Sequence, residues 1–329
     1  MIALIEITPW YWVGFILCIL FFLALDLGVF HRGARVVKFA EALAWSLLWF
    51  SLAMLFAGAL AHGRGHEEAV QFTTGYLIEL SLSLDNLLVI ALIFSAFRVL
   101  PQFQHCVLFW GILGALLMRG TMIAAGVALI REFDWVLYVF GVFLVFTGFK
   151  MLFAGKQTVE PEKSPVLRLM RKLFPVTPHF EGEQFFTRLN NRFALTPLAL
   201  VLVLVETTDL IFAVDSVPAV FSITKSAFIV FTSNVFAILG LRSMYFLLAG
   251  ALGYFRYLKI GLSVVLVFVG VKMLLDPHDQ TPKWFQVEIP TNVSLMIVAT
   301  VVLIAIVLST MVAEREKRTR QAGQNRKAK

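Results

Sequence analysis

The chain has 329 residues, of which 59% are hydrophobic and only 15% are charged, and its mean hydropathy is +0.84. Soluble globular domains carry about 25% charged residues, so this composition excludes a water-soluble globule and indicates a polytopic membrane protein. The formal net charge is +7, but the basic residues gather in short loops and in the C-terminal tail. That pattern is typical of membrane topology, so we expect a lipid bilayer as partner and no nucleic acid.

Nine apolar runs are long enough to cross the ~30 Å hydrocarbon layer of a bilayer. They lie near residues 10–30, 42–61, 72–96, 106–130, 135–154, 196–221, 226–249, 258–275 and 291–313. The first follows no basic segment, so we interpret it as a retained helix and not as a cleaved signal peptide. The runs predict an all-α fold with nine transmembrane helices.

The orientation follows from counting Lys and Arg in alternate loops. Loops 31–41, 97–105, 155–195 and 250–259, together with the tail, carry twenty, whereas the opposite loops carry four. The positive-inside rule therefore predicts an N-terminus outside and a C-terminus in the cytoplasm.

The chain contains an internal sequence repeat of two matching segments. The carboxylate of Glu79 precedes Asp85-Asn86 by six residues, as Asp209 precedes Asp215-Ser216. Downstream, Arg119 matches Arg242, and Val145-Phe-Thr-Gly-Phe-Lys150-Met-Leu matches Val267-Phe-Val-Gly-Val-Lys272-Met-Leu. Each unit holds three helices, an odd number, so we predict an inverted repeat.

The predicted organisation has six parts. They are two N-terminal helices (1–71), the first repeat (72–154), a cytoplasmic linker (155–195), the second repeat (196–275), a final helix (276–313) and a basic tail (314–329). The linker segment 166–174 is basic and amphipathic, and it suits either the inner leaflet or a solvated linker. We expect the tail to be disordered or to rest on anionic lipid.

Ionisable residues inside the spans identify the candidate site, because each costs about 2.5–3.5 kcal/mol at the bilayer centre. Six acids and four bases lie there, leaving two negative charges that suit one divalent cation. The alternative is a set of buried ion pairs that fixes the helix register. The predicted metal ligands are Glu79, Asp85, Asn86, Glu206, Asp209 and Asp215. Supporting groups are Ser83, Thr208, Ser216, Val214 and Pro218, and charge partners are Arg119, Lys150, Arg242, Lys272 and Asp26.

Residues six apart on a regular helix are separated by ~240°, so Glu79 and Asp85 can face one site only if their helix is interrupted. The same holds for Asp209 and Asp215. Pro218 would supply an interruption by freeing the Val214 carbonyl. We therefore expect broken helices around a cage of four carboxylates, with Glu206 lining its cytoplasmic approach.

The donors in this site are oxygens, since the six histidines lie in loops or at span ends and neither cysteine accompanies the acids. Oxygen ligands favour Mn²⁺, Ca²⁺ or Mg²⁺ over zinc, copper or nickel. We expect no organic cofactor. Burial raises the pKa of an unoccupied carboxylate, so proton exchange is a candidate coupling.

The two acidic motifs, the Arg242-Ser-Met and Lys272-Met-Leu elements and the Asp26-Leu-Gly-Val-Phe-His31-Arg start resemble the TerC family of integral membrane proteins, in particular its Alx-like bacterial branch, over roughly residues 10 to 315. The resemblance implies Mn²⁺ export across the bacterial inner membrane, an older link to tellurium resistance, and membership in the lysine-exporter superfamily.

Other functions remain open at this point. One is a membrane scaffold or insertion helper without transport, and another is an exporter of calcium or of amino acids. An intramembrane aspartyl hydrolase would need a Gly-x-Gly-Asp element, which the chain lacks, so we expect no enzyme.

Overall fold

In the computed structural model, the chain is an α-helical membrane protein with one small β-hairpin. The structure describes residues 9–30, 39–133, 135–153, 164–189, 192–249, 258–276 and 286–327. The long helices before the linker are α1 (Pro9–Phe30), α2 (Phe39–Gly63), α3 (His66–Ala96), α4 (Pro101–Glu132) and α5 (Val136–Phe153). Those after it are α7 (Pro197–Phe221), α8 (Ala227–Ala249), α9 (Leu258–Leu275) and α10 (Thr291–Lys327).

Seven of these helices are long and apolar enough to cross a membrane within the described residues: α2, α3, α4, α5, α7, α8 and α10. The other two, α1 and α9, are helical over their predicted spans but are not among the seven. A polytopic membrane fold is therefore supported, and the count of nine spans stays a prediction.

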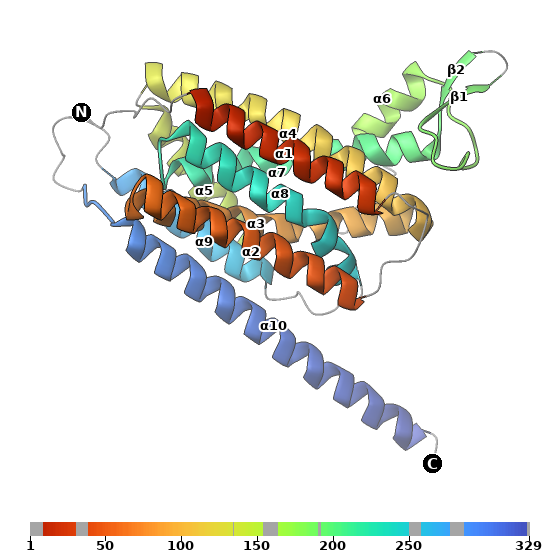
Figure 1. The fold of residues 1–329 in the computed structure, drawn as a ribbon. Coiled ribbons are helices and arrows are strands. Elements are labelled where there is room, and N and C mark those ends of the chain that lie inside the picture. The colour runs from red at the N-terminus through yellow and green to blue at the C-terminus, as the bar shows by residue number, and fades with distance from the viewer. Residues whose placement is uncertain are drawn as a thin grey trace.

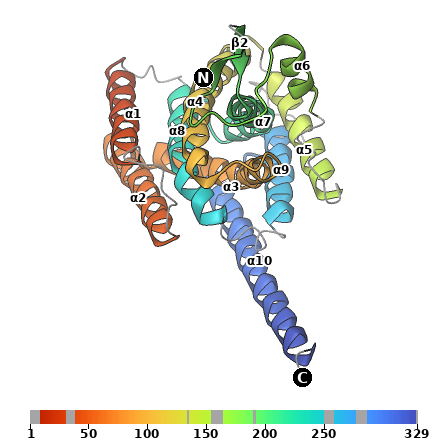
Figure 2. The same ribbon diagram turned by 90° about the vertical axis from the view of Figure 1, so that its right-hand side faces the viewer.

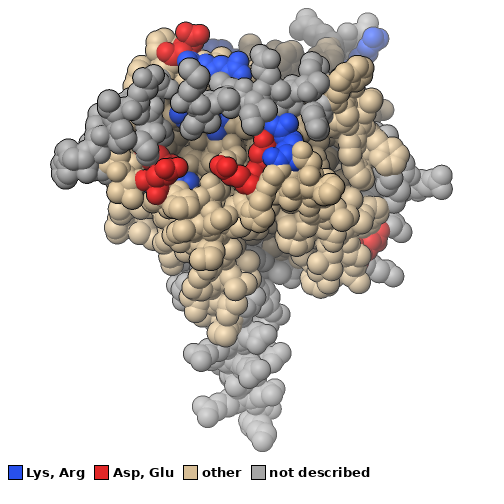
Figure 3. Space-filling view, turned by 60° about the vertical axis from the view of Figure 1, so that its left-hand side comes forward, with Lys and Arg blue, Asp and Glu red and all other residues tan. Residues whose placement is uncertain are grey.

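The bundle is built around α3 and α8, the most deeply buried of the seven. Helix α3 packs against α2, α7, α8 and α10, and α4 packs against α7 and α8. Figure 1 shows the long helices running roughly along one axis, and Figure 2 shows α3 and α7 near the middle of the end view. Uncharged side chains cover most of the described surface in Figure 3, as lipid contact requires.

Helices α5 and α9 pack closely through glycines that the two repeats share. A Cβ on Gly148 would lie 2.7 Å from Val267 Cγ2 and 2.9 Å from the Ser263 carbonyl oxygen. A Cβ on Gly270 would lie 2.8 Å both from Val145 Cγ2 and from the Gly141 oxygen. Each glycine therefore admits the partner backbone, and the two contacts relate positions that match in the sequence repeat.

The linker contains a short helix, α6 (Pro165–Leu173), followed by β1 (Phe186–Leu189) and β2 (Arg192–Leu195). The strands are antiparallel, with Phe186 opposite Leu195 and Leu189 opposite Arg192. Thr196 then caps α7, since its hydroxyl accepts a hydrogen bond from the Ala199 amide. This ordered hairpin is the one departure from an all-α fold in the described chain.

The C-terminal tail corrects one of two predicted alternatives. Disorder over 314–329 is wrong for the described part of the tail, because α10 continues as helix to Lys327, whereas contact with anionic lipid stays a prediction. Residues 314–327 are rich in Glu, Lys, Arg and Gln, which have high helix propensity, so the helix extends past its apolar part. Figure 1 shows it projecting beyond the bundle.

Candidate functional site

The candidate site lies where α3, α4, α7 and α8 meet. Glu79 comes from α3, Arg119 from α4, Asp209 from α7 and Asn234 from α8, and none of these side chains is more than 4% exposed. The packing of α3 and α4 against α7 and α8 brings them together. The two carboxylates hold matching positions in the sequence repeat, so each half contributes one acid.

Arg119 joins the two carboxylates. Its Nη1 donates a hydrogen bond to Glu79 Oε1. Its Nη2 and Nε donate to Asp209 Oδ1 and Oδ2 at 2.8 and 3.2 Å, so that contact is bidentate. Charge-assisted pairs of this kind are the strongest hydrogen bonds in proteins. One fixed cation thus lies between the acids of both halves.

Uncharged polar groups complete the network. Asn86 donates to Asp209 Oδ1 at 2.7 Å, and Asn234 donates to Glu79 Oε2 at 3.0 Å. Arg119 Nη1 also donates to Asn234 Oδ1 at 3.0 Å and to Ser216 Oγ at 3.3 Å. Ser83 Oγ lies 3.4 Å from Glu79 Oε1. With both acids ionised, the network carries one net negative charge.

Asn234 is the site residue that sequence reasoning missed. It interrupts the apolar α8 two turns before Arg242, next to Ser233. A search for ionisable residues alone passes over it, because an amide carries no charge. A buried asparagine in a membrane helix is itself a signal, since its amide needs partners.

The expected broken helices and four-carboxylate cage are wrong. Helix α3 is continuous through Glu79 and Asp85, and α7 continues through Asp215 and Pro218. On a regular helix the two acids of each motif are ~240° apart, so they cannot meet. Within the described residues, no three Asp, Glu, His or Cys side chains are placed to share a metal ion.

The second acid of each motif, Asp85 or Asp215, faces a different helix from the first acid of the same motif. Asp85 is half-buried, and its charged neighbour is Lys259 at the start of α9. Asp215, also half-buried, faces α5, where Thr147 and Lys150 are its polar neighbours. These two acids therefore lie outside the Arg119 network.

Glu206 packs against α4 at Gly114, where the helix carries no side chain. Its carboxylate fills the space beside Gly114, where a Cβ would come within 2.0 Å of Oε1. It lies one turn before Asp209 on α7, so the two acids share a side of the helix. Two buried oxygens in this region, Glu206 Oε2 and Asn86 Oδ1, have no hydrogen-bond donor among the described residues. Leaving such groups unsatisfied costs about 1–3 kcal/mol each, so they have capacity for a donor or a cation.

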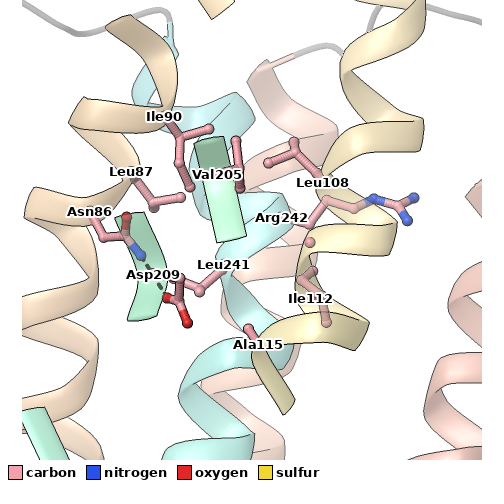
Figure 4. Close-up of a pocket in the computed structure, with 11 residues that line it drawn as sticks. Asn86, Leu87, Ile90, Leu108, Ile112, Ala115, Val205, Asp209, Leu241 and Arg242 are labelled. Atoms are coloured by element: carbon pink, nitrogen blue, oxygen red, sulfur yellow. Dashed lines mark hydrogen bonds between the residues drawn. The ribbon is translucent and has the colours of Figure 1, made fainter. Parts of the chain in front are cut away.

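A cavity of about 30 Å³ adjoins this region between α3, α4, α7 and α8. Asn86 and Asp209 line one side, and apolar side chains such as Ile90, Leu108 and Leu241 line much of the rest. Figure 4 shows Asn86 turned toward Asp209, while the Arg242 guanidinium points away from it. The matching arginines of the repeat thus have different surroundings, and of these two it is Arg119 that joins the two acids.

The remaining predicted residues are placed as follows. Lys272 is 2% exposed, with Asp276 and Glu288 as charged neighbours, whereas Lys150 is exposed. The Thr208 hydroxyl bonds the Leu204 carbonyl of its own helix at 2.7 Å. Val214 is 43% exposed, and Pro218 is buried. Asp26 lies in α1, but its side chain is outside the described residues.

The chain is similar to proteins of one membrane family over almost its whole length. The integral membrane protein TerC family matches residues 64–317. An uncharacterized membrane protein STKORF319 of Myxococcus xanthus is 52% identical over 302 residues, 92% of each chain. The putative membrane-bound redox modulator Alx of Escherichia coli K12 is 44% identical over 322 residues, 95% of this chain and 98% of the relative. No solved structure matches. The family match and these identities together show that the chain belongs to the TerC family of integral membrane proteins.

Proposed function

We propose that this protein is a divalent-cation transporter that exports Mn²⁺ from the cytoplasm through a carboxylate site in mid-membrane. The observation that carries the proposal is the pair formed by Glu79 and Asp209, one acid from each repeat, held by a single arginine. Buried ionisable residues in membrane helices commonly mark ion pathways.

The donor set supports a hard cation. Glu79, Asp209, Asn86, Asn234 and Ser216 offer only oxygen as a ligand atom for a metal in or next to the network. Such donors suit Mn²⁺, Ca²⁺ and Mg²⁺. The choice of manganese among these comes from the family resemblance, so the transport assay must rank the three ions.

Arg119 has a defined role in this proposal. Its guanidinium occupies the space between Glu79 and Asp209, and a divalent ion there would be repelled by it. Cation binding therefore requires Arg119 to release at least one carboxylate. The divalent ion then replaces the guanidinium at the carboxylate that Arg119 releases, and the network changes from one net negative charge to one net positive charge. Asn86 Oδ1 and Glu206 Oε2 provide further oxygens close by.

Asp85 and Asp215 act in this proposal as separate stations outside the central network, since Asp85 faces Lys259 of α9 and Asp215 faces α5. Glu206 lies one turn before Asp209, nearer the start of α7, and in this proposal it lines the approach from the cytoplasm. Proton exchange is the proposed coupling, since carboxylates vacated by the metal in an apolar setting favour protonation.

An inverted repeat with nine spans, an external N-terminus and a cytoplasmic C-terminus completes the proposal. Support comes from α5 and α9, where Gly148 against Ser263 and Val267 matches Gly270 against Gly141 and Val145. This is the contact pattern expected from a two-fold axis between the repeats. Many secondary transporters alternate access by moving one such repeat against the other.

The test measures ion uptake by inside-out vesicles that contain the wild type, Glu79→Gln or Asp209→Asn. Glu68→Gln is the matched control, because Glu68 belongs to the same helix as Glu79 but pairs with Arg64 outside the network. We expect the wild type and the control to take up Mn²⁺, the two central variants to lose uptake, and a pH dye to report proton release. Gel filtration of each variant verifies folding.

Each alternative gives a different result. Equal Mn²⁺ uptake in the wild type and both central variants would refute the site. Uptake of Ca²⁺ or an amino acid in place of Mn²⁺ would change the substrate. No ion uptake by the wild type would favour a scaffold or insertion helper.

A further inference from the structure

The linker carries an exposed apolar surface that the transport site does not use. It consists of Leu169, Leu173, Phe174, Phe186 and Phe193, here called the α6–hairpin surface. Phe186 and Phe193 are 58% and 54% exposed, and their rings stack with centroids 5.2 Å apart. Phe174 adds an edge contact to Phe193 at 6.1 Å. The three rings therefore form one patch that links the end of α6 to the hairpin.

The strand register explains why these groups share a face. Arg188 is directly opposite Phe193, and directly opposed residues lie on the same side of a sheet. Phe186 is two residues from Arg188, so it lies on that side as well. On α6, Leu167 is fully buried, whereas Leu169 and Leu173, one turn apart, are 52% and 58% exposed. Helix α6 thus buries Leu167 on one side and exposes the apolar pair Leu169 and Leu173 on another.

Basic side chains surround the patch. Arg188 accompanies the aromatic rings on the hairpin, and Arg168 and Lys172 are exposed beside the leucine stripe. Residues 164–195 contain five Lys and Arg and two acids, Glu181 and Glu183. Aromatic and leucine side chains flanked by Lys and Arg are typical of segments that lie in the headgroup region of a membrane.

The position of the surface also suits lipid. In Figures 1 and 2, α6 lies at the edge of the bundle, at the end that carries the α3–α4 connection, and Figure 1 shows the hairpin reaching past that end, toward the level expected for lipid headgroups. The hairpin is held there by backbone bonds from Thr177 to Leu195 and from Leu195 to Pro175, at 2.9 Å each. Cys106 at the start of α4 also contacts the Glu183 carbonyl, at 3.8 Å. The exposed rings are therefore fixed in place.

We propose that the α6–hairpin surface binds the anionic headgroup layer of the membrane that the bundle crosses, with the three Phe rings and two Leu side chains inserted among the lipids and the basic residues on their phosphates. The charge complementarity between the basic rim and anionic lipid selects this occupant over a second copy of the chain, whose corresponding surface would be equally basic. The proposal depends on the bundle crossing a membrane and not on which ion it carries.

The experiment uses the full chain in lipid nanodiscs with a nitroxide label at Phe193→Cys and, separately, at Glu181→Cys. The background is Cys18→Ala with Cys106→Ser, because serine keeps a donor toward the Glu183 carbonyl. Collisions with oxygen report contact with lipid, and collisions with a water-soluble nickel chelate report contact with solvent. In discs of phosphatidylglycerol we expect label 193 to favour oxygen and label 181 to favour nickel.

Charge and lipid provide the controls. Arg188→Gln is expected to lower the ratio of inserted to solvated label roughly fivefold in anionic discs, since each basic residue adds appreciable affinity for an anionic surface. In neutral phosphatidylcholine discs the same change should have little effect. A label at Leu173→Cys tests the α6 stripe independently and replaces position 193 if that variant does not fold.

Two results would overturn the proposal. One is nickel access at 173 and 193 equal to that at 181 in both lipids, which means a solvated surface. The other is protection from nickel that persists in detergent micelles and increases with protein concentration, which means a second copy of the chain.

Discussion

The pairing of Arg119 with Glu79 makes a quantitative prediction about stability. Glu79 is fully buried, and Arg119 is 2% exposed. Removing one partner from a buried pair costs about 3–5 kcal/mol, because the other charge is left uncompensated. Glu79→Gln should lie near the lower end, since Arg119 keeps its two bonds to Asp209. Arg119→Met should lie near the upper end, because it leaves two carboxylates facing each other.

A double-mutant cycle isolates the pair. In the double variant Glu79 no longer faces Asp209 as an uncompensated charge, so this variant should be more stable than the sum of the single losses predicts, by about 2–3 kcal/mol. The matched control is the Arg64–Glu68 pair, which joins the turn before α3 to the first turn of α3 and whose side chains are 11% and 15% exposed. This pair involves two charges and not three, so we expect its coupling energy to be smaller, because it lacks the repulsion between two carboxylates that the loss of Arg119 exposes.

The assay is unfolding in mixed detergent micelles with increasing sodium dodecyl sulfate, followed by tryptophan fluorescence. Both cycles use the same Met and Gln replacements, so differences in side-chain size cancel. A coupling energy for Arg119 and Glu79 no larger than that of the control cycle would refute the reasoning. It would mean that the guanidinium is not shared between the two repeats in the folded protein.

Three further predictions concern the packing of the helices. Gly148→Ala should lower stability by about 1–3 kcal/mol, because its Cβ would come within 3.0 Å of backbone atoms of α9. The control Gly58→Ala should leave stability unchanged, since its Cβ would meet nothing within 4 Å. Equal thermal midpoints for the two variants would contradict the close α5–α9 contact. Glu206→Gln should leave the thermal midpoint unchanged or raise it, because the buried Oε2 of this half-buried side chain has no donor among the described residues. A large decrease in the midpoint would show that this oxygen has a partner. Pro218→Ala should stabilise α7 by up to about 3 kcal/mol while Mn²⁺ uptake persists, because the helix is continuous at this position. Loss of uptake in a stable variant would show that the proline has a role in transport.

The all-α membrane fold and the repeated motifs could be read from the sequence, because both depend on local composition, whereas the count of nine spans and the inverted topology stay predictions. Apolar runs and the Lys and Arg bias follow directly from the cost of placing polar groups in hydrocarbon. The repeat follows from matching motifs, such as Gly148-Phe-Lys150 and Gly270-Val-Lys272. The same matching identified Glu79 and Asp209 as equivalent positions, and these are the two acids that the structure brings together.

Only the tertiary structure decided how the site is assembled. Whether α3 and α7 were interrupted could not be read from Pro218, because neighbouring helices can support a proline inside a continuous membrane helix. The inclusion of Asn234 and the choice of Arg119 over Arg242 depend on how α4 and α8 pack against α3 and α7. Composition and spacing determine which polar groups enter the membrane, whereas helix rotation and packing determine which of them meet.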